Sequence, residues 1–178
     1  MTETTIATLF NQISHFLTVD PTRKLEGMLP TLESHRVVGY DSLVSFDTEQ
    51  YHRRLLYQDQ MVDAFLLTWL PGQGTRFHGH PERGCIYRVL QGSLMEERIV
   101  EGVIHSQQLQ LGSCSYIDNT VGIHKVSNCG TVPAISLHFY APAGFYTGNN
   151  QSSTTRTHIE TDDQKQNSDS QDQDQDKD

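Results

Sequence analysis

Three histidines in two parts of the chain have the residue type and spacing of a metal site. His78 and His80 are separated by one residue, in a segment (75–80) that the sequence pattern predicts to be a strand. Alternate residues of a strand point to the same face, so both imidazoles could bind one ion at adjacent positions. Two histidines at this spacing are a weak signal alone, about as consistent with a polar strand face as with a metal.

Glycines at fixed distances give the histidine pair a context. Gly72 lies six residues before His78. Gly92 lies twelve residues after His80. This spacing resembles the first sequence motif of the cupin superfamily. The acidic ligand of that motif is missing, because no acid stands four or five residues after His80.

A second motif supplies a third imidazole. The second cupin motif is matched around Gly112, His124 and Asn128, which predicts that His124 joins the pair from a neighbouring strand. Three neutral imidazoles leave more positive charge on a divalent ion than two imidazoles and a carboxylate do, and this favours direct binding of an anionic thiolate. Glu82 stays an alternative carboxylate ligand, and zinc or nickel would accept the same donors as iron.

Three longer segments narrow the resemblance to one family. Residues 78–96, which include Cys85 five residues after His80, are similar to the metal-binding region of cysteine dioxygenases. Residues 115–128 and 133–142 are similar to the two blocks that follow in the same family. The resemblance runs from about residue 51 to residue 142.

The resemblance implies a fold, a cofactor and a reaction. The fold would be mainly β, a cupin (jelly-roll-like) β-barrel with short N-terminal helices. The cofactor would be Fe(2+), held by His78, His80 and His124, with no organic cofactor. The substrates would be L-cysteine and O2, and the product cysteine sulfinic acid.

The resemblance also implies a covalent link beside the metal. Cys85 and Tyr140 match the pair that forms a thioether cross-link in the family. A free cysteine is more often an ordinary buried thiol, but the presence of a matching Tyr140 favours the pair.

Ser136, His138 and Tyr140 alternate along one predicted strand. They therefore face the same way, and a hydrogen-bonded chain through His138 could orient the Tyr140 hydroxyl toward a bound substrate. The apolar Leu137 and Phe139 between them indicate that both faces of the strand are buried, where polar groups need partners. No aspartate accompanies the serine and histidine, so hydrolase chemistry is disfavoured.

An arginine is expected to hold the far end of the substrate. Arg53 matches the carboxylate-binding arginine of the family, and a guanidinium offers a planar, permanently charged fork for that purpose. Tyr51 would line the same pocket. Arg54 stays an alternative, because a deletion before His78 relative to the family leaves the choice between the two arginines open.

These side chains need a β framework to position them. Apolar residues recur at three- and four-residue spacing from Ile6 to Leu17, which predicts an amphipathic helix that ends at Asp20-Pro21. A second, weaker helical stretch spans about 24–34 and is interrupted by Pro30. Farther along, short apolar runs between turn residues predict antiparallel strands at 54–58, 64–70, 75–80, 85–90, 93–100, 103–111, 113–117, 122–127 and 134–140.

The length of 178 residues fits a single domain. We place this cupin domain at residues 1–148. Residues 149–178 are rich in Gln, Ser, Asn and Asp and carry eight acids and three bases. Because they contain almost no apolar residues to offset the entropy of ordering, they are predicted to be a disordered acidic tail.

Charge and cysteine content exclude several classes of protein. A formal net charge of -9 without a cluster of Lys and Arg argues against a nucleic-acid partner. Three cysteines without a C-x-x-C pair argue against a disulfide framework and a structural zinc site. The sequence has no membrane-length apolar run and no signal-peptide pattern, so a cytoplasmic protein, monomeric and without a membrane partner, is expected.

Two alternative functions stay open. The first is a dioxygenase for a related small thiol, such as 3-mercaptopropionate or cysteamine. The second is a non-catalytic metal-binding cupin, because a fold alone does not determine a function.

Overall fold

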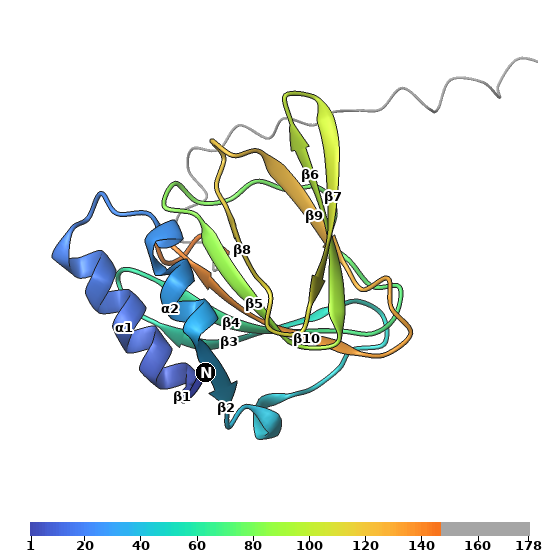
Figure 1. Cartoon of the computed structure of the whole chain (residues 1–178), viewed down its shortest axis with the longest axis horizontal. Coiled ribbons are helices and arrows are strands. Elements are labelled where there is room, and N and C mark those ends of the chain that lie inside the picture. The colour runs from blue at the N-terminus through green and yellow to red at the C-terminus, as the bar shows by residue number, and fades with distance from the viewer. Residues whose placement is uncertain (147–178) are drawn as a thin grey trace, which may run out of the picture.

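Two antiparallel sheets that face each other form the framework of the protein (Figure 1). The computed structural model describes residues 1–146. One sheet has the order β3 (His52–Gln58), β4 (Asp63–Trp69), β10 (Ala134–Tyr140), β5 (Cys85–Gln91) and β8 (Cys114–Ile117). The other has the order β7 (Val103–Gln110), β6 (Ser93–Val100) and β9 (Ile123–Ser127). The predicted acidic tail, 149–178, lies outside the described residues.

The alternation of side chains along the central strands explains why both faces of the larger sheet are buried. In β10, Leu137 and Phe139 belong to an apolar cluster shared with the N-terminal helices. Tyr140 belongs to a second cluster, which lies between the sheets and includes Leu94 of β6 and Val126 of β9. The polar side chains on the inner face of β10 are therefore enclosed and need internal partners.

Helices cover the outer face of the five-stranded sheet (Figure 1). Helix α1 (Ile6–Val19) begins after Thr5, whose side-chain oxygen accepts a hydrogen bond from the Thr8 amide, and it buries an apolar stripe at helical spacing. A short 3-10 turn (Leu25–Met28) leads into α2 (Leu29–Ser34). Pro30 lies in the first turn of α2, where its missing N–H costs no hydrogen bond.

Three small elements were not expected from the sequence. Strands β1 (Thr2–Thr5) and β2 (His35–Val38), which precede and follow these helices in the sequence, pair with each other in parallel. A second 3-10 turn spans Asp41–Leu43 and leads toward β3.

The mainly β cupin-type fold is confirmed, with two differences from the prediction. The predicted strands correspond to β3–β10 except for 75–80, which forms one isolated bridge, at His78, and is otherwise a loop. Within residues 1–146 the two larger sheets have separate hydrogen-bond networks, so they do not close into one barrel. In the same residues no helix has the length and apolar character needed to cross a membrane.

Candidate metal centre

His78, His80 and His124 come together between the two sheets. One potential ligand atom from each lies within 4.8 Å of the others. The ring centroids are 4.8 Å apart for His78 and His80, and 4.5 Å apart for His80 and His124. His124 is on β9, whereas the other two lie on the loop between β4 and β5. The predicted three-histidine group is thus present, although its first two members are not on a strand.

Backbone contacts hold this loop against β9. The His78 amide donates to the His124 carbonyl at 2.9 Å, and the His124 amide donates back to His78 at 3.1 Å. The His80 amide donates to the Asn119 side-chain oxygen at 2.8 Å. A Cβ at Gly79 would lie only 2.6 Å from that same oxygen, so a larger residue there would displace the Asn119 side chain from this hydrogen bond. The histidines therefore share a face because of long-range contacts.

In two of the histidines, hydrogen bonds determine which ring nitrogen is free to bind a metal ion. Nδ1 of His78 lies 2.8 Å from the Arg76 carbonyl oxygen. Nδ1 of His124 lies 2.7 Å from Oε1 of Glu96. Both oxygens act as acceptors, so each Nδ1 carries the proton and each Nε2 keeps a free lone pair.

The site favours the neutral, ligating form of its imidazoles. Burial, with a contribution from the nearby His124, lowers the pKa of His78 to about 4. Burial also holds the pKa of His80 well below its usual value. Nδ1 of His80 is buried without a hydrogen-bond partner among residues 1–146. A cluster of neutral, buried ring nitrogens fits a borderline metal ion that accepts nitrogen ligands.

Glu96 is a site residue that the sequence reasoning missed. It is almost completely buried, accepts from His124, accepts from the Ser115 hydroxyl at 2.9 Å, and pairs with Arg98 at 3.0 Å. Burial alone would raise the pKa of its carboxyl, but the bonds from His124 and Arg98 hold the pKa below its usual value. The sequence carried a signal for it, because Glu96 follows Leu94 by two residues and so occupies the same inward face of β6.

Glu82, the alternative ligand, does not join the site. Its side chain is exposed, and the histidine group does not include it. The carboxylate near the metal centre therefore lies behind one imidazole rather than among the ligands.

Ser136, His138 and Tyr140 form a buried hydrogen-bonded chain. Ser136 Oγ is 2.8 Å from His138 Nε2, and His138 Nδ1 is 3.2 Å from the Tyr140 hydroxyl. The indole N–H of Trp69 donates to Ser136 Oγ at 3.0 Å. Burial, together with nearby cationic groups, holds the pKa of His138 well below its usual value, so the ring is neutral.

The direction of this chain follows from its two ends. Trp69 can only donate, so Ser136 has its own proton available to donate to His138 Nε2. The neutral imidazole then carries its proton on Nδ1 and donates to the oxygen of Tyr140. This leaves the Tyr140 O–H proton available for another acceptor.

Cys85 lies next to this chain. It is the antiparallel partner of Tyr140 in the pairing of β5 with β10, so the two side chains share one face of the sheet. Both side chains are buried, and burial raises the pKa of the Cys85 thiol and of the Tyr140 phenol. Sγ of Cys85 also lies 3.9 Å from His138 Nδ1.

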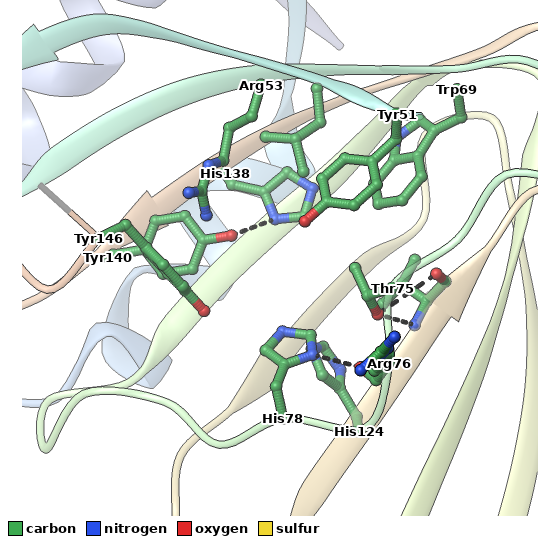
Figure 2. A pocket seen from close by; sticks show the side chains of 12 residues that line it. Tyr51, Arg53, Trp69, Thr75, Arg76, His78, His124, His138, Tyr140 and Tyr146 are labelled. Atoms are coloured by element: carbon green, nitrogen blue, oxygen red, sulfur yellow. Dashed lines mark hydrogen bonds between the residues drawn. The ribbon is translucent and has the colours of Figure 1, made fainter. Parts of the chain in front are cut away.

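A cavity of about 260 Å³ connects the histidines with the Tyr140 wall (Figure 2). Tyr51, Arg53, His138 and Tyr140 line it from the five-stranded sheet and the segment before β3, whereas His124 lines it from β9. His80, Cys85 and Ser136 lie buried outside the cavity lining.

The structure places Arg53, and not Arg54, in this cavity. Neighbouring residues of β3 point to opposite faces. Arg54 is exposed and donates to the Leu43 carbonyl at 3.1 Å. Tyr51 stacks on Trp69 with ring centroids 4.7 Å apart. Tyr146 also lines the cavity, next to Arg53, and the sequence reasoning gave it no role.

Comparison with known proteins gives a family match over most of the chain. The family model described as cysteine dioxygenase type I matches residues 2–151. The protein named cysteine dioxygenase type 1 is 34% identical over 107 residues in Rattus norvegicus and 35% identical over 107 residues in Homo sapiens. Each alignment covers 54% of this chain and 54% of the relative. The chain thus spans about half the length of the curated relatives it matches.

Solved structures give the fold independently. A protein from Thermus thermophilus superposes with a TM-score of 0.52 at 23% identity, covering 60% of this chain and 97% of that one. A protein from Klebsiella pneumoniae with a double-stranded beta-helix domain superposes with a TM-score of 0.52 at 21% identity, covering 61% and 91%. At this identity the likeness supports the fold alone.

Proposed function

Because the chain belongs to the cysteine dioxygenase type I family, we propose that it is an iron-dependent enzyme that oxidises the thiol of L-cysteine with O2 to cysteine sulfinic acid. The observation that carries the proposal is the arrangement of one cavity. The imidazoles of His78 and His124 lie on one side of it, and the Arg53 guanidinium and the Tyr140 hydroxyl lie on the other.

His78, His80 and His124 would hold the Fe(II) ion. When bound, the ion would supply the redox chemistry that joins O2 to a thiolate, and would lower the pKa of the substrate thiol. In the overall reaction both oxygen atoms of O2 become bonded to sulfur, which is oxidised by four electrons while O2 is reduced by four. The Cys-derived product keeps its amine and its carboxylate.

Arg53 would bind the carboxylate of the substrate. A guanidinium can grip a carboxylate in two places, which fixes the orientation of the molecule as well as its position. Arg53 lines the same cavity as His78 and His124, so a short thiol could contact both the guanidinium and the metal site at once. Tyr51 would close the wall beside Arg53.

Tyr140 would donate its proton to the substrate side of the cavity. His138 donates to the Tyr140 oxygen, so the phenol proton is the one free to point at a bound ligand. Burial keeps the phenol protonated at neutral pH because its pKa is raised. A donor held in this way needs no rearrangement when charge develops on the substrate.

We further propose that Cys85 and Tyr140 become joined by a thioether bond, as in the family that the chain belongs to. The bond would form between Sγ and a ring carbon, with the loss of one hydrogen from each residue and with O2 as the two-electron oxidant. The pairing of these residues on adjacent strands supports the proposal.

The test is oxygen uptake by the Fe(II)-loaded protein with L-cysteine, combined with mass spectrometry of the product. The same measurement is made with 3-mercaptopropionate and with cysteamine. Cysteine sulfinic acid formed fastest from L-cysteine supports the proposal. Faster turnover of 3-mercaptopropionate or cysteamine would mean that this other thiol is the substrate. An iron-loaded protein that consumes no O2 with any of the three thiols would be a non-catalytic cupin.

A further inference from the structure

The Arg53 guanidinium lies in the cavity without a protein partner of opposite charge. No ion pair or hydrogen bond of its side chain occurs within residues 1–146; its contacts there are with aromatic rings. Its Cζ lies 4.3 Å from the ring centroid of Tyr146 and 5.3 Å from that of Phe65. A partly buried cation of this kind is best satisfied by an anionic ligand.

The nearer ring constrains how such a ligand can approach. Aromatic rings attract a guanidinium through its flat face, whereas the N–H groups of the guanidinium point outward in its plane. The guanidinium carbon of Arg53 lies over the Tyr146 ring, and a guanidinium stacked on such a ring keeps its N–H groups available in its own plane. A carboxylate would bind to that edge of the guanidinium.

Tyr146 is itself held by neighbours in the sheet. Its ring meets Tyr140 edge to face, with centroids 4.8 Å apart and planes at 77°. Two residues earlier, the Gly144 amide donates to the buried Asp63 carboxylate at 2.7 Å. Asp63 is the first residue of β4, so the turn before Tyr146 is fixed to the sheet that carries Arg53.

We propose that Tyr146 determines the preference of the cavity for thiols that carry a carboxylate. It would do so as a positioning residue, by holding the Arg53 guanidinium in the orientation that meets a carboxylate while the thiol reaches the histidines. The inference rests on the proposed oxidation of a small thiol. It predicts that Tyr146 matters for L-cysteine and not for cysteamine, which has no carboxylate.

Ligand binding without turnover tests this inference. Trp69 is the only tryptophan of the chain and lines the same cavity, so its fluorescence reports binding. Dissociation constants for L-cysteine and cysteamine are measured on the Fe(II)-loaded full chain with O2 excluded. The variants are Tyr146→Leu, which removes the ring, and Tyr146→Phe, which keeps it. Tyr57→Leu is the matched control, because Tyr57 stacks on Phe10 outside the cavity.

The expected result is a selective effect. Tyr146→Leu should weaken L-cysteine binding roughly 5- to 20-fold, as for the loss of a partly buried cation–π contact, and should change cysteamine binding less than about twofold. Tyr146→Phe and Tyr57→Leu should each stay within about twofold of the parent for both thiols. Thermal unfolding of each variant verifies that it is folded.

Three outcomes would overturn the inference: unchanged L-cysteine binding in Tyr146→Leu, equal weakening of both thiols, or equal weakening in Tyr146→Phe and Tyr146→Leu. Oxygen uptake by the parent separates this failure from that of the proposed function. A parent that binds L-cysteine selectively through Tyr146 but consumes no O2 would overturn only the proposed function. A parent that oxidises L-cysteine while Tyr146→Leu binds it normally would overturn only the present inference.

Discussion

The Glu96 carboxylate lies 2.7 Å from Nδ1 of His124 and is buried behind that imidazole. A carboxylate in this position fixes the tautomer of the ring and raises the basicity of Nε2. Glu96→Gln keeps an acceptor oxygen but removes the negative charge. We expect it to weaken metal binding roughly 10- to 100-fold, measured by competition with a chelator.

Glu97→Gln is the control for that substitution. Glu97 is the next residue of β6, points to the other face, and pairs with Lys125 at 2.8 Å near the surface. Its loss should leave metal affinity unchanged. Equal affinity in Glu96→Gln and the parent would mean that Glu96 has no influence on the metal.

Arg53 and Arg54 offer a second matched pair. Arg53→Ala removes the guanidinium from the cavity, so the KM for L-cysteine should rise roughly 10- to 100-fold, as for the loss of charge-assisted hydrogen bonds. The KM for cysteamine should change less than about threefold, because no carboxylate is involved. Arg54→Ala should leave both values near those of the parent. Equal effects of Arg53→Ala on the two thiols would contradict the carboxylate role.

Much of the framework could be predicted because it depends on local alternation. In β10, apolar residues alternate with Ser136, His138 and Tyr140, and the strand has the predicted bounds. The segment 75–80 has a similar pattern but is a loop, because its conformation depends on the His78 bridge to His124 and on the Gly79 approach to Asn119. Such contacts join residues far apart in sequence, and spacing does not report them.

The two site residues that were missed have the same explanation. Glu96 reaches His124 diagonally, because it is paired with Val126 in the register of β6 and β9. Tyr146 reaches Arg53 through a turn that Asp63 holds. Both relationships depend on register and on turn geometry, which local sequence does not specify.

Ser136 should act on catalysis through the tautomer of His138. Ser136→Ala leaves His138 Nε2 without its donor, so the proton can move to Nε2 and the Tyr140 hydroxyl would then donate to Nδ1 rather than to a substrate. We expect kcat to fall roughly 10-fold or more, with little change in the KM for L-cysteine. The pH profile of kcat in Ser136→Ala should differ from that of the parent as well.

Ser127→Ala controls for the loss of a buried hydroxyl, because Ser127 lies on β9 and contacts Cys129 at 3.3 Å rather than the His138 chain. It should keep the kcat of the parent. An unaltered kcat and pH profile in Ser136→Ala would exclude a role for the chain in proton placement.

The proposed Cys85–Tyr140 bond can be detected by mass. After incubation with Fe(II), O2 and L-cysteine, intact protein should contain a species lighter by two hydrogens that survives thiol reduction, and peptide mapping should join β5 to β10. Cys85→Ser should lack this species, whereas Cys114→Ser should retain it because Cys114 lies outside the cavity. A reducible species, or one that persists in Cys85→Ser, would be a different modification.

Asp118 should make the stability of the protein depend on pH in acid. It is buried after β8, accepts from Lys24 at 2.5 Å and from the Tyr116 hydroxyl at 2.6 Å. Burial would raise the pKa of its carboxyl, but these bonds and those from Thr120 and Val121 hold the pKa well below its usual value. The folded state thus binds the proton less readily than the unfolded state, so the stabilisation is full above about pH 4 and is lost as the pH falls below it.

Asp118→Asn should therefore be destabilising at neutral pH and less so in acid. At pH 7 we expect a loss of about 2 kcal/mol in the free energy of unfolding, or roughly 4–8 °C in Tm, because hydrogen bonds to a charged group are removed. Thermal unfolding between pH 7 and pH 2 should show the gap to the parent narrowing below about pH 4, where the Asp118 carboxyl of the unfolded parent begins to be protonated while that of the folded parent stays charged. Asp41→Asn, at an exposed position, should follow the parent throughout. A gap that stays constant down to pH 2 would show that the charge of Asp118 does not stabilise the fold, and that only the shape of its side chain does.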